Sequence, residues 1–217
     1  FCSVIMEGRG IPAKGAFPGS FSYGNDAVET VSYDPEEAKK LLEESGWTDT
    51  DGDGYVDKDG QKLTINWLTY PTRLEQPKLA EYAQATLKEI GIDVSVNNTS
   101  DHRTYAENGE FDVYVSSLTT APTGDPEYFF SSTVTGSKNY GNYQNDEVTK
   151  LTEQLHQTFD TDERGKLAVE LQQKILDDDA YFFVSHLNMG IVTKANVTGM
   201  AAHPCDYYEI TADLDVQ

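Results

Sequence analysis

The sequence predicts an α/β fold built on a small, mostly parallel sheet that is flanked by helices. Three observations support this prediction. Alternating apolar residues mark strands at 62–70 and 92–96, and one helical pattern lies between them. This strand–helix–strand order is typical of a parallel pair with a right-handed crossover. A third strand pattern, FDVYVSS, follows at 111–117.

The first clear element after a Gly- and Pro-rich stretch at 8–33 is a helix that begins beside Asp34. Asp34 suits the N-cap, Pro35 suits the first helical position, and Glu37 completes a capping box. Gly46 is placed to end the helix in the left-handed conformation. The apolar stripe of this helix consists of Ala38, Leu41 and Leu42.

The sheet elements are joined by two further helices. A helix from about 77 to 90 ends at Gly91 and connects the first two strands. A short helix near 101–108 leads to the third strand. These connections place helices on the faces of the sheet.

Beyond the third strand, the chain changes character. The segment 118–145 is rich in Thr, Gly, Asn and aromatic residues and has little periodicity. Two amphipathic helices follow, one around 148–155 and one around 162–176. YFFVSHL and GIVTK are then predicted to form a hairpin about Asn188 and Met189.

The charge of the chain excludes two classes of partner. The 217 residues include 37 acidic and 16 basic side chains, which gives a net charge of −21. Such a surface repels nucleic acid and anionic lipid. No apolar run approaches the roughly 18 residues that a membrane helix needs.

The start of the chain indicates a fragment. There is no initiator Met, and Phe1, Val4 and Ile5 fall on one face of an expected helix, so the chain opens inside an element. We therefore expect an upstream part to be missing. For this reason, the lack of a signal peptide carries no information about compartment.

The acidic loop DTDGDGYVDKDG raises the question of a calcium site. Asp49, Asp51 and Asp53, with Gly54, match the first half of an EF-hand loop. The bidentate Glu is absent, because Gly60 holds its place, and a strand follows where an EF-hand has its second helix. Asp and Gly also build tight turns. A turn with weak, incidental calcium is therefore favoured over a functional calcium site.

The cysteines and histidines form no metal-ligand pattern. Cys2 and Cys205 lie near opposite ends of the chain; either they pair, which would favour an oxidising compartment, or they are unrelated thiols. His186 lies in a predicted strand, in the core or facing a pocket, and the core is favoured. The other three, His102, His156 and His203, are not at ligand spacing, and His156 is expected on the polar side of its helix.

The segment 118–145 is the best candidate for a binding site, because ligands tend to bind where loops leave the carboxyl ends of parallel strands. Its neutral hydrogen-bonding groups and ring faces suit a pocket that holds a polar small molecule without reacting with it. The alternative is a long loop packed over the sheet by its own aromatic residues. No nucleophile elbow, phosphate loop or paired-carboxylate motif is present. The candidate ligand-binding residues are Thr119, Thr120, Pro122, Thr123, Asn139, Tyr140, Asn142 and Tyr143.

Four stretches, in order along the chain, resemble one known family. They are MEGRGIPAKGAFP, YDPEEAKKLLEESGWTDTDGDGYVDKDGQKL, FDVYVSSLTTAPTGDPEYFF and NYGNYQNDEVTKL. Together they are similar to the C-terminal lobe of the extracytoplasmic solute-binding proteins of ABC importers, in the family that binds peptides, nickel and metal chelates (family 5). The resemblance implies a type II periplasmic-binding-protein-like lobe over 1–217, with 1–33 and 195–217 near the hinge and the N-terminal lobe absent. In relatives, the acidic loop is an ordinary connection remote from the cleft.

The resemblance also implies a function without catalysis. Relatives trap a ligand between two lobes and deliver it to an ABC permease in the membrane. The implied location is extracytoplasmic, either periplasmic or lipid-anchored, and no cofactor is implied. The alternatives are a hydrolase that uses acidic residues, such as a glycosidase, and a plain interaction domain.

Two positions bear on the ligand that the resemblance implies. Pro122 stands where peptide-binding relatives often carry an Asp that holds the peptide's amino terminus, and Thr119 stands where they carry a Trp. Both departures favour nickel or another metal, carried as a chelate, over a short peptide. The anionic end of such a chelate would face the missing lobe or Lys138.

Overall fold

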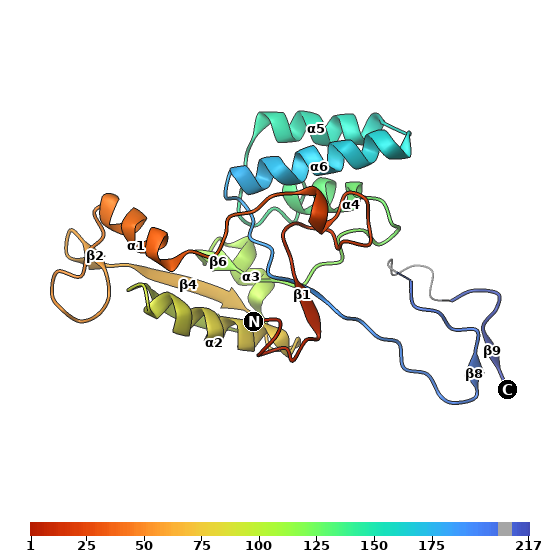
Figure 1. The fold of residues 1–217 in the computed structure, drawn as a ribbon, viewed down its shortest axis with the longest axis horizontal. Helices are drawn as coiled ribbons and strands as arrows, with labels where there is room; N and C mark the ends of the chain where they lie inside the picture. The colour runs from red at the N-terminus through yellow and green to blue at the C-terminus, as the bar shows by residue number, and fades with distance from the viewer. Residues whose placement is uncertain (204–209) are drawn as a thin grey trace. The chain divides into compact units, whose positions relative to one another are not determined.

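The computed structural model describes residues 1–203 and 210–217, and the chain forms two compact units. Unit 1 consists of Phe1 and Val31–Ser117, and unit 2 consists of Cys2–Thr30 and Leu118–Gln217. Figure 1 follows the chain from one end to the other. None of the helices in the described residues has the length and apolar character needed to cross a membrane.

Unit 1 is built on the predicted parallel sheet. Strand β4 (Thr64–Thr69) lies in the centre, between β5 (Asp93–Asn98) and β6 (Val113–Tyr114), and both neighbours run parallel to it. Helix α2 (Glu75–Lys88) connects β4 to β5, and α3 (His102–Glu107) connects β5 to β6. The α/β prediction is therefore confirmed, and so is the strand–helix–strand order.

Helix α2 covers one face of this sheet. It packs against β4 and β5, lies along β4 in Figure 1, and buries Leu79, Ala80 and Ala83. Apolar side chains alternate along both strands, and the register pairs Ile65 with Val94. Since alternate residues of a strand point to opposite faces, the intervening residues face the other side of the sheet.

Helix α1 (Pro35–Glu44) begins where the sequence predicts. The Asp34 side chain accepts a hydrogen bond of 3.0 Å from the Glu37 amide, and Gly46 adopts a φ of +84° after the last turn. The predicted apolar stripe, however, is not buried: Leu41 is 53 % exposed, and α1 contributes no buried side chain. The acidic loop after α1 leads into a hairpin of β2 (Asp57–Lys58) and β3 (Gln61–Lys62).

Unit 2 corrects the predicted hairpin about Asn188. Strand β7 (Ser185–Leu187) pairs antiparallel with β1 (Gly10–Pro12), not with the segment that follows it. Gly10 permits this contact, because a Cβ there would lie 3.0 Å from the His186 carbonyl oxygen. The late strand β8 (Val197–Thr198) pairs instead with β9 (Asp215–Val216).

The amino-terminal residues also depart from expectation. The first residues form turns rather than a helix, and Val4 is 80 % exposed. Glu7 and Gly8 both have positive φ, which a helix cannot accommodate, and the Gly8 amide bonds back to the Cys2 carbonyl. A short 3-10 helix, η1 (Asn25–Ala27), lies within the stretch expected to be loop.

The core of unit 2 lies among helices. Helices α5 (Asp146–Gln157) and α6 (Thr161–Asp177) pack together, as Figure 1 shows, and each begins at a capping side chain, Asn145 and Asp160. The short helix α4 (Glu127–Phe129) and the π-helical turn η2 (Phe130–Val134) contribute aromatic residues to this core. The largest fully buried side chains of unit 2 are Phe17, Phe129, Phe130, Leu155, Leu171, Ile175 and Gln172.

Gln172 is a polar residue in this core. Its side chain is fully buried on α6, and its Oε1 accepts a hydrogen bond of 3.0 Å from the Ala16 amide. Its Nε2 donates to the Tyr23 carbonyl at 2.7 Å and to the Ala168 carbonyl. Gln172 therefore fixes the loop between β1 and η1 onto α6.

We predict that Gln172→Leu lowers the free energy of unfolding by about 2–4 kcal/mol, because it leaves a buried amide and a buried carbonyl without partners. Chemical denaturation measures this change. Gln173→Leu is the matched control: Gln173 also bonds to a loop residue, Glu29, but it is only half-buried, so water can replace it. Equal losses for the two variants would contradict the assignment of Gln172 as the buried anchor.

Candidate functional site

The segment 118–145 follows β6 and is held to the amino-terminal loop of unit 2 by two hydrogen bonds. The Thr120 hydroxyl donates to the Ala16 carbonyl at 2.9 Å, and the Tyr23 hydroxyl donates to the Gly124 carbonyl at 2.7 Å. Gly124 has a φ of +81°, a conformation in which a side chain would be strained. The turn is therefore fixed on both sides by loop residues that Gln172 anchors in turn.

Arg164 on α6 provides the strongest anchor of this segment. Its Nε and Nη2 donate to the two carboxylate oxygens of Asp125 at 2.8 and 2.6 Å, and Nη2 also donates to Glu127 at 2.9 Å. Its Nη1 donates to the carbonyls of Leu155 and Thr158, both at 2.6 Å. A guanidinium has five N–H donors in a rigid fork, and five bonds are made here. One side chain thus joins the Gly-Asp-Pro turn, α4, the end of α5 and α6.

The charges around Arg164 are coupled. Burial opposes ionisation of Asp125, but hydrogen bonds from Arg164 and from the Glu127 amide outweigh it, so the pKa of Asp125 is held below its usual range. The same competition lowers the pKa of Glu127, where His156 Nδ1 lies 2.6 Å from the carboxylate. Both carboxylates are therefore ionised, structural partners of the guanidinium rather than proton donors.

The second half of the segment is fixed by its own side chains. The Asn139 side chain bonds to both the amide and the carbonyl of Tyr143. The Tyr143 hydroxyl donates to Asp178 at 2.5 Å, and the Asn145 side-chain Nδ2 donates to the same oxygen at 2.7 Å. Burial and the bond to Asp178 raise the pKa of Tyr143 well above its usual value.

The predicted ligand-binding residues therefore fall into two groups, those whose side chains hold the segment in place and those that are exposed. Thr120, Asn139 and Tyr143 use their side chains to hold the segment in place, and Pro122 is buried. The exposed members are Thr119, Thr123 and Asn142, with Asn142 at a φ of +51°, and Tyr140 is half-buried. Lys138 lies over the Tyr128 ring and donates to its hydroxyl at 3.0 Å.

Residue patterns alone did not identify Asp125, Arg164 and Gln172, which give this segment its shape. For Asp125, the signal in the sequence was the Gly-Asp-Pro triplet, which is part of one stretch that carries the family resemblance. Arg164 is 39 residues from Asp125, and Gln172 is 149 residues from Tyr23 and 156 from Ala16, so no local pattern connects these pairs.

The described histidines do not gather at one place. His186 is half-buried and lies 3.2 Å from Asn25 Oδ1, and burial lowers the pKa of its imidazole. His102 stacks on Tyr70 and bonds to the Tyr114 hydroxyl at 2.7 Å, and burial lowers its pKa as well. His156, expected to be solvated, is exposed but pairs with Glu127. Cys2 is buried, and Cys205 lies outside the described residues, so their pairing stays a prediction.

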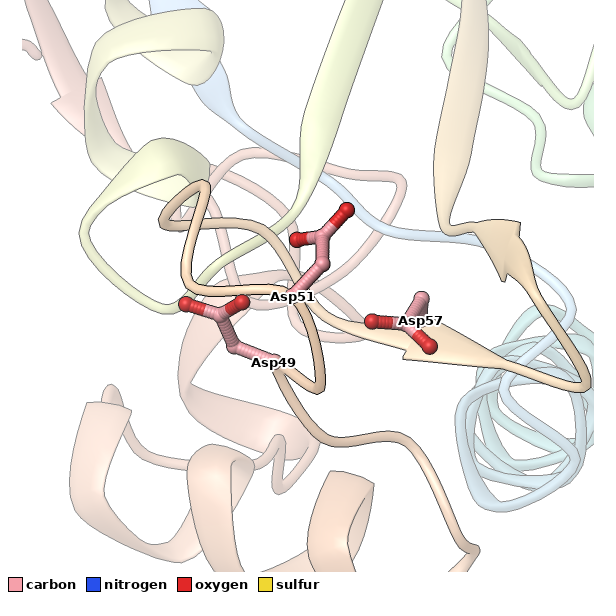
Figure 2. A group of neighbouring side chains, drawn as sticks. All are labelled: Asp49, Asp51 and Asp57. Carbon is pink, nitrogen blue, oxygen red and sulfur yellow. The ribbon is translucent and has the colours of Figure 1, made fainter.

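The acidic loop brings together a different trio from the one predicted. One carboxylate oxygen each of Asp49, Asp51 and Asp57 lies within 4.8 Å of the others, and Figure 2 shows the three side chains around the loop. Asp53 is instead paired with Lys62 at 2.5 Å, and the hydrogen bond from Lys62 lowers its pKa.

Much of this loop is satisfied by its own backbone. Asp49 accepts hydrogen bonds from the amides of Gly52 and Gly54, and Asp57 accepts from the amide and hydroxyl of Thr50. Hydrogen bonds from nearby backbone amides to Asp side chains are typical of tight turns, so the loop has the structure of a turn.

Comparison with known proteins places the chain in a family. A family model described as bacterial extracellular solute-binding proteins, family 5 Middle, matches residues 2–141. The chain belongs to this family. The oligopeptide-binding protein AppA of Bacillus subtilis is 32 % identical over 96 % of this chain and 40 % of its own length. The nickel-binding periplasmic protein of Escherichia coli is 28 % identical over 87 % of this chain and 37 % of its own length.

Solved structures support the fold of a family 5 protein. AppA from Bacillus subtilis, in complex with a nonapeptide, matches with a TM-score of 0.76 at 26 % identity, over 94 % of this chain and 42 % of that one. NikA from Staphylococcus aureus, in complex with Ni(L-His)2, matches with a TM-score of 0.78 at 24 % identity, over 100 % and 45 %. The type II periplasmic-binding-protein fold is confirmed, and the chain spans about two-fifths of the length of these relatives.

The Arg164 cluster predicts a specific pH dependence of stability. The native pKa values of Asp125 and Glu127 lie below their usual values, so the unfolded chain takes up protons first as pH falls. The stabilisation is complete above pH of about 5 and is lost as pH drops through the lowered native values. Asp125→Asn should therefore lower the free energy of unfolding by about 1–3 kcal/mol at pH 7 and flatten its decline in acid.

Denaturation at a series of pH values measures both effects. Asp162→Asn is the control, because Asp162 is an exposed carboxylate at the start of the same helix and makes no ion pair with Arg164. An acid profile of Asp125→Asn as steep as that of the unaltered protein would contradict the cluster's role.

For the acidic loop, we predict calcium binding no tighter than about 0.1–1 mM, because three carboxylates without a bidentate Glu make a poor cage. Calorimetric titration measures it. Asp51→Asn should remove the binding, whereas Asp53→Asn should retain it, since Asp53 is engaged by Lys62. A micromolar affinity, or equal loss in both variants, would contradict this interpretation.

Proposed function

We propose that this chain is part of the substrate-binding component of an ABC importer that captures a polar small molecule and delivers it to a membrane permease. The observation that carries the proposal is membership of the family 5 solute-binding proteins, together with a preformed Gly-Asp-Pro turn that exposes neutral groups. The complete protein would hold the ligand between this lobe and a second one and act outside the cytoplasm. Closure would then be a shift of population driven by ligand.

The ligand class follows from the groups that segment 118–145 leaves exposed. Thr119, Thr123 and Asn142 are exposed neutral side chains, and Lys138 is the exposed cation of the segment. Relatives named as binding oligopeptides and relatives named as binding nickel are both similar to the chain. Pro122 cannot hold a peptide's amino terminus, which favours nickel or another metal, delivered inside a chelate, over a short peptide.

The hydrolase alternative gains no support from the electrostatics. A glycosidase needs one carboxylic acid whose pKa is raised so that it can donate a proton. Over residues 1–203 and 210–217, the carboxyl groups with a clear shift are Asp53, Asp125, Glu127 and Asp178, and the pKa of each is lowered. The family is one of binding proteins without catalysis, and we extend this to the present chain.

The test is native mass spectrometry of the full-length protein purified from its own host. We expect a small molecule, a metal chelate or a short peptide, to remain bound, and its addition to the emptied protein should compact the protein in small-angle scattering. Turnover of the bound molecule, or a protein that neither retains a ligand nor closes, would contradict the proposal.

A pair of variants localises the binding. Thr123→Tyr should weaken ligand binding by about tenfold or more, because a bulky ring would crowd the exposed turn. Gln154→Tyr is the control on an exposed position of α5 whose side chain makes no hydrogen bond within the described chain. Both variants should melt within a few degrees of the unaltered protein, so that a change in affinity is separated from a change in stability.

A further inference from the structure

The face of the unit 1 sheet opposite α2 is unusually polar. The register pairs Asn66 of β4 with Ser95 of β5, and Leu68 with Asn97, so these four side chains share one face. Leu68 is buried, but Asn66 and Ser95 are exposed. A sheet face that is covered by a long helix is normally apolar, and α3 is only six residues long.

A hollow of about 500 Å³ lies over this polar face. Its walls come from three places: the strands β4 and β5, the helix α3, and the loop that leads from α3 into β6. All of them belong to unit 1, and the volume is within the range of small-molecule sites. The lining residues used below are Asn66, Ser95, Asn97, Tyr105, Glu110 and Asp112.

Two carboxylates in this hollow are held in place but not neutralised. Asp112 Oδ2 accepts hydrogen bonds from the Asn66 amide at 2.7 Å and from the Asn66 side chain at 2.8 Å. Glu110 Oε1 accepts one from the Asn108 side chain at 2.8 Å. Each carboxylate keeps its second oxygen, and within the described parts of the chain neither forms an ion pair.

Three further groups converge on the same space without a partner. In residues 1–203 and 210–217, the side chains of Ser95, Asn97 and Tyr105 make no hydrogen bond. Tyr105 and the neighbouring Phe111 add ring surface to the walls. The hollow thus combines fixed negative oxygens, neutral acceptors and aromatic rings, and it contains no cation of its own.

We infer that this hollow is a second binding site, distinct from segment 118–145, for a small organic cation that carries several N–H donors, such as an amine or a guanidine. Charge-assisted hydrogen bonds to two carboxylates and contact with ring faces are the interactions that such a cation makes. A neutral sugar would fit the amide and hydroxyl groups. Its hydroxyls would also donate to the two exposed carboxylates, but a neutral ligand brings no positive charge to pair with them.

The inference is independent of the proposed importer function, and a pair of probes of equal length tests it. Putrescine carries two ammonium groups, and 1,4-butanediol carries two hydroxyls in the same positions. Each is titrated into isotope-labelled protein in 0.15 M salt, which screens the general attraction of an acidic surface. We expect putrescine alone to shift backbone amide signals, and to shift them at Asn66, Ser95, Asn97 and the loop at 109–112. Equal shifts with the diol, binding of glucose in place of putrescine, or shifts spread over the acidic surface would overturn the inference.

Matched variants separate the hollow from net charge. Glu110→Gln with Asp112→Asn keeps acceptors for Asn108 and Asn66 but removes two charges, and it should weaken putrescine about tenfold or more. Glu81→Gln with Glu89→Gln removes the same charge from α2 and its C-terminus, and it should change the affinity less than about twofold. Equal weakening in both would overturn the inference. If the first variant does not fold, Ser95→Lys places a tethered ammonium on an exposed position and should block putrescine; unchanged binding would overturn the inference.

Discussion

Unit 2 depends on two polar side chains of α6, Arg164 and Gln172. Arg164 holds the Gly-Asp-Pro turn through Asp125, and Gln172 holds the loop that carries Ala16 and Tyr23. The two loops are then joined to each other through Thr120 and Gly124. Because buried polar groups are costly without partners, this closed network has one well-satisfied arrangement. We infer that this network orders the turn without any contribution from a ligand.

Such a frame suits the binding role that we propose for the 28-residue segment 118–145. Loops with few fixed contacts must be ordered when a ligand binds, and the lost entropy weakens affinity. Here the hydrogen bonds of Asn139, Tyr143 and Asp125 have already ordered the chain. The acidic loop of unit 1 is ordered in a similar way, because the side chains of Asp49 and Asp57 accept hydrogen bonds from its backbone amides.

The sequence predicted the elements that local patterns encode, but not the features that depend on contacts between residues far apart in the chain. The parallel strands, the Asp34 cap and the helices α2, α5 and α6 followed from periodicity and capping residues. The hairpin predicted about Asn188 was wrong, because β7 pairs with β1. The residues of a strand do not by themselves determine which other strand it pairs with. Asp59-Gly60 is a dipeptide typical of a tight hairpin turn, but this stretch was interpreted only as an acidic loop, so the β2–β3 hairpin was not predicted. Segment 118–145 stays a prediction as a binding site, and the division of its candidate residues into anchoring and exposed side chains depends on tertiary contacts that local patterns do not encode.

The central claim is that α6 orders the Gly-Asp-Pro turn in the absence of ligand. Amide hydrogen exchange of the unliganded protein tests it most directly, at the Gly124 and Glu127 amides, which bond to the Ala121 carbonyl and to Asp125. The account predicts slow exchange at both, and faster exchange there in Arg164→Lys, which cannot form the bidentate pair, while β4 stays protected. Exchange at the rate of an unstructured peptide in the unaltered protein would contradict it.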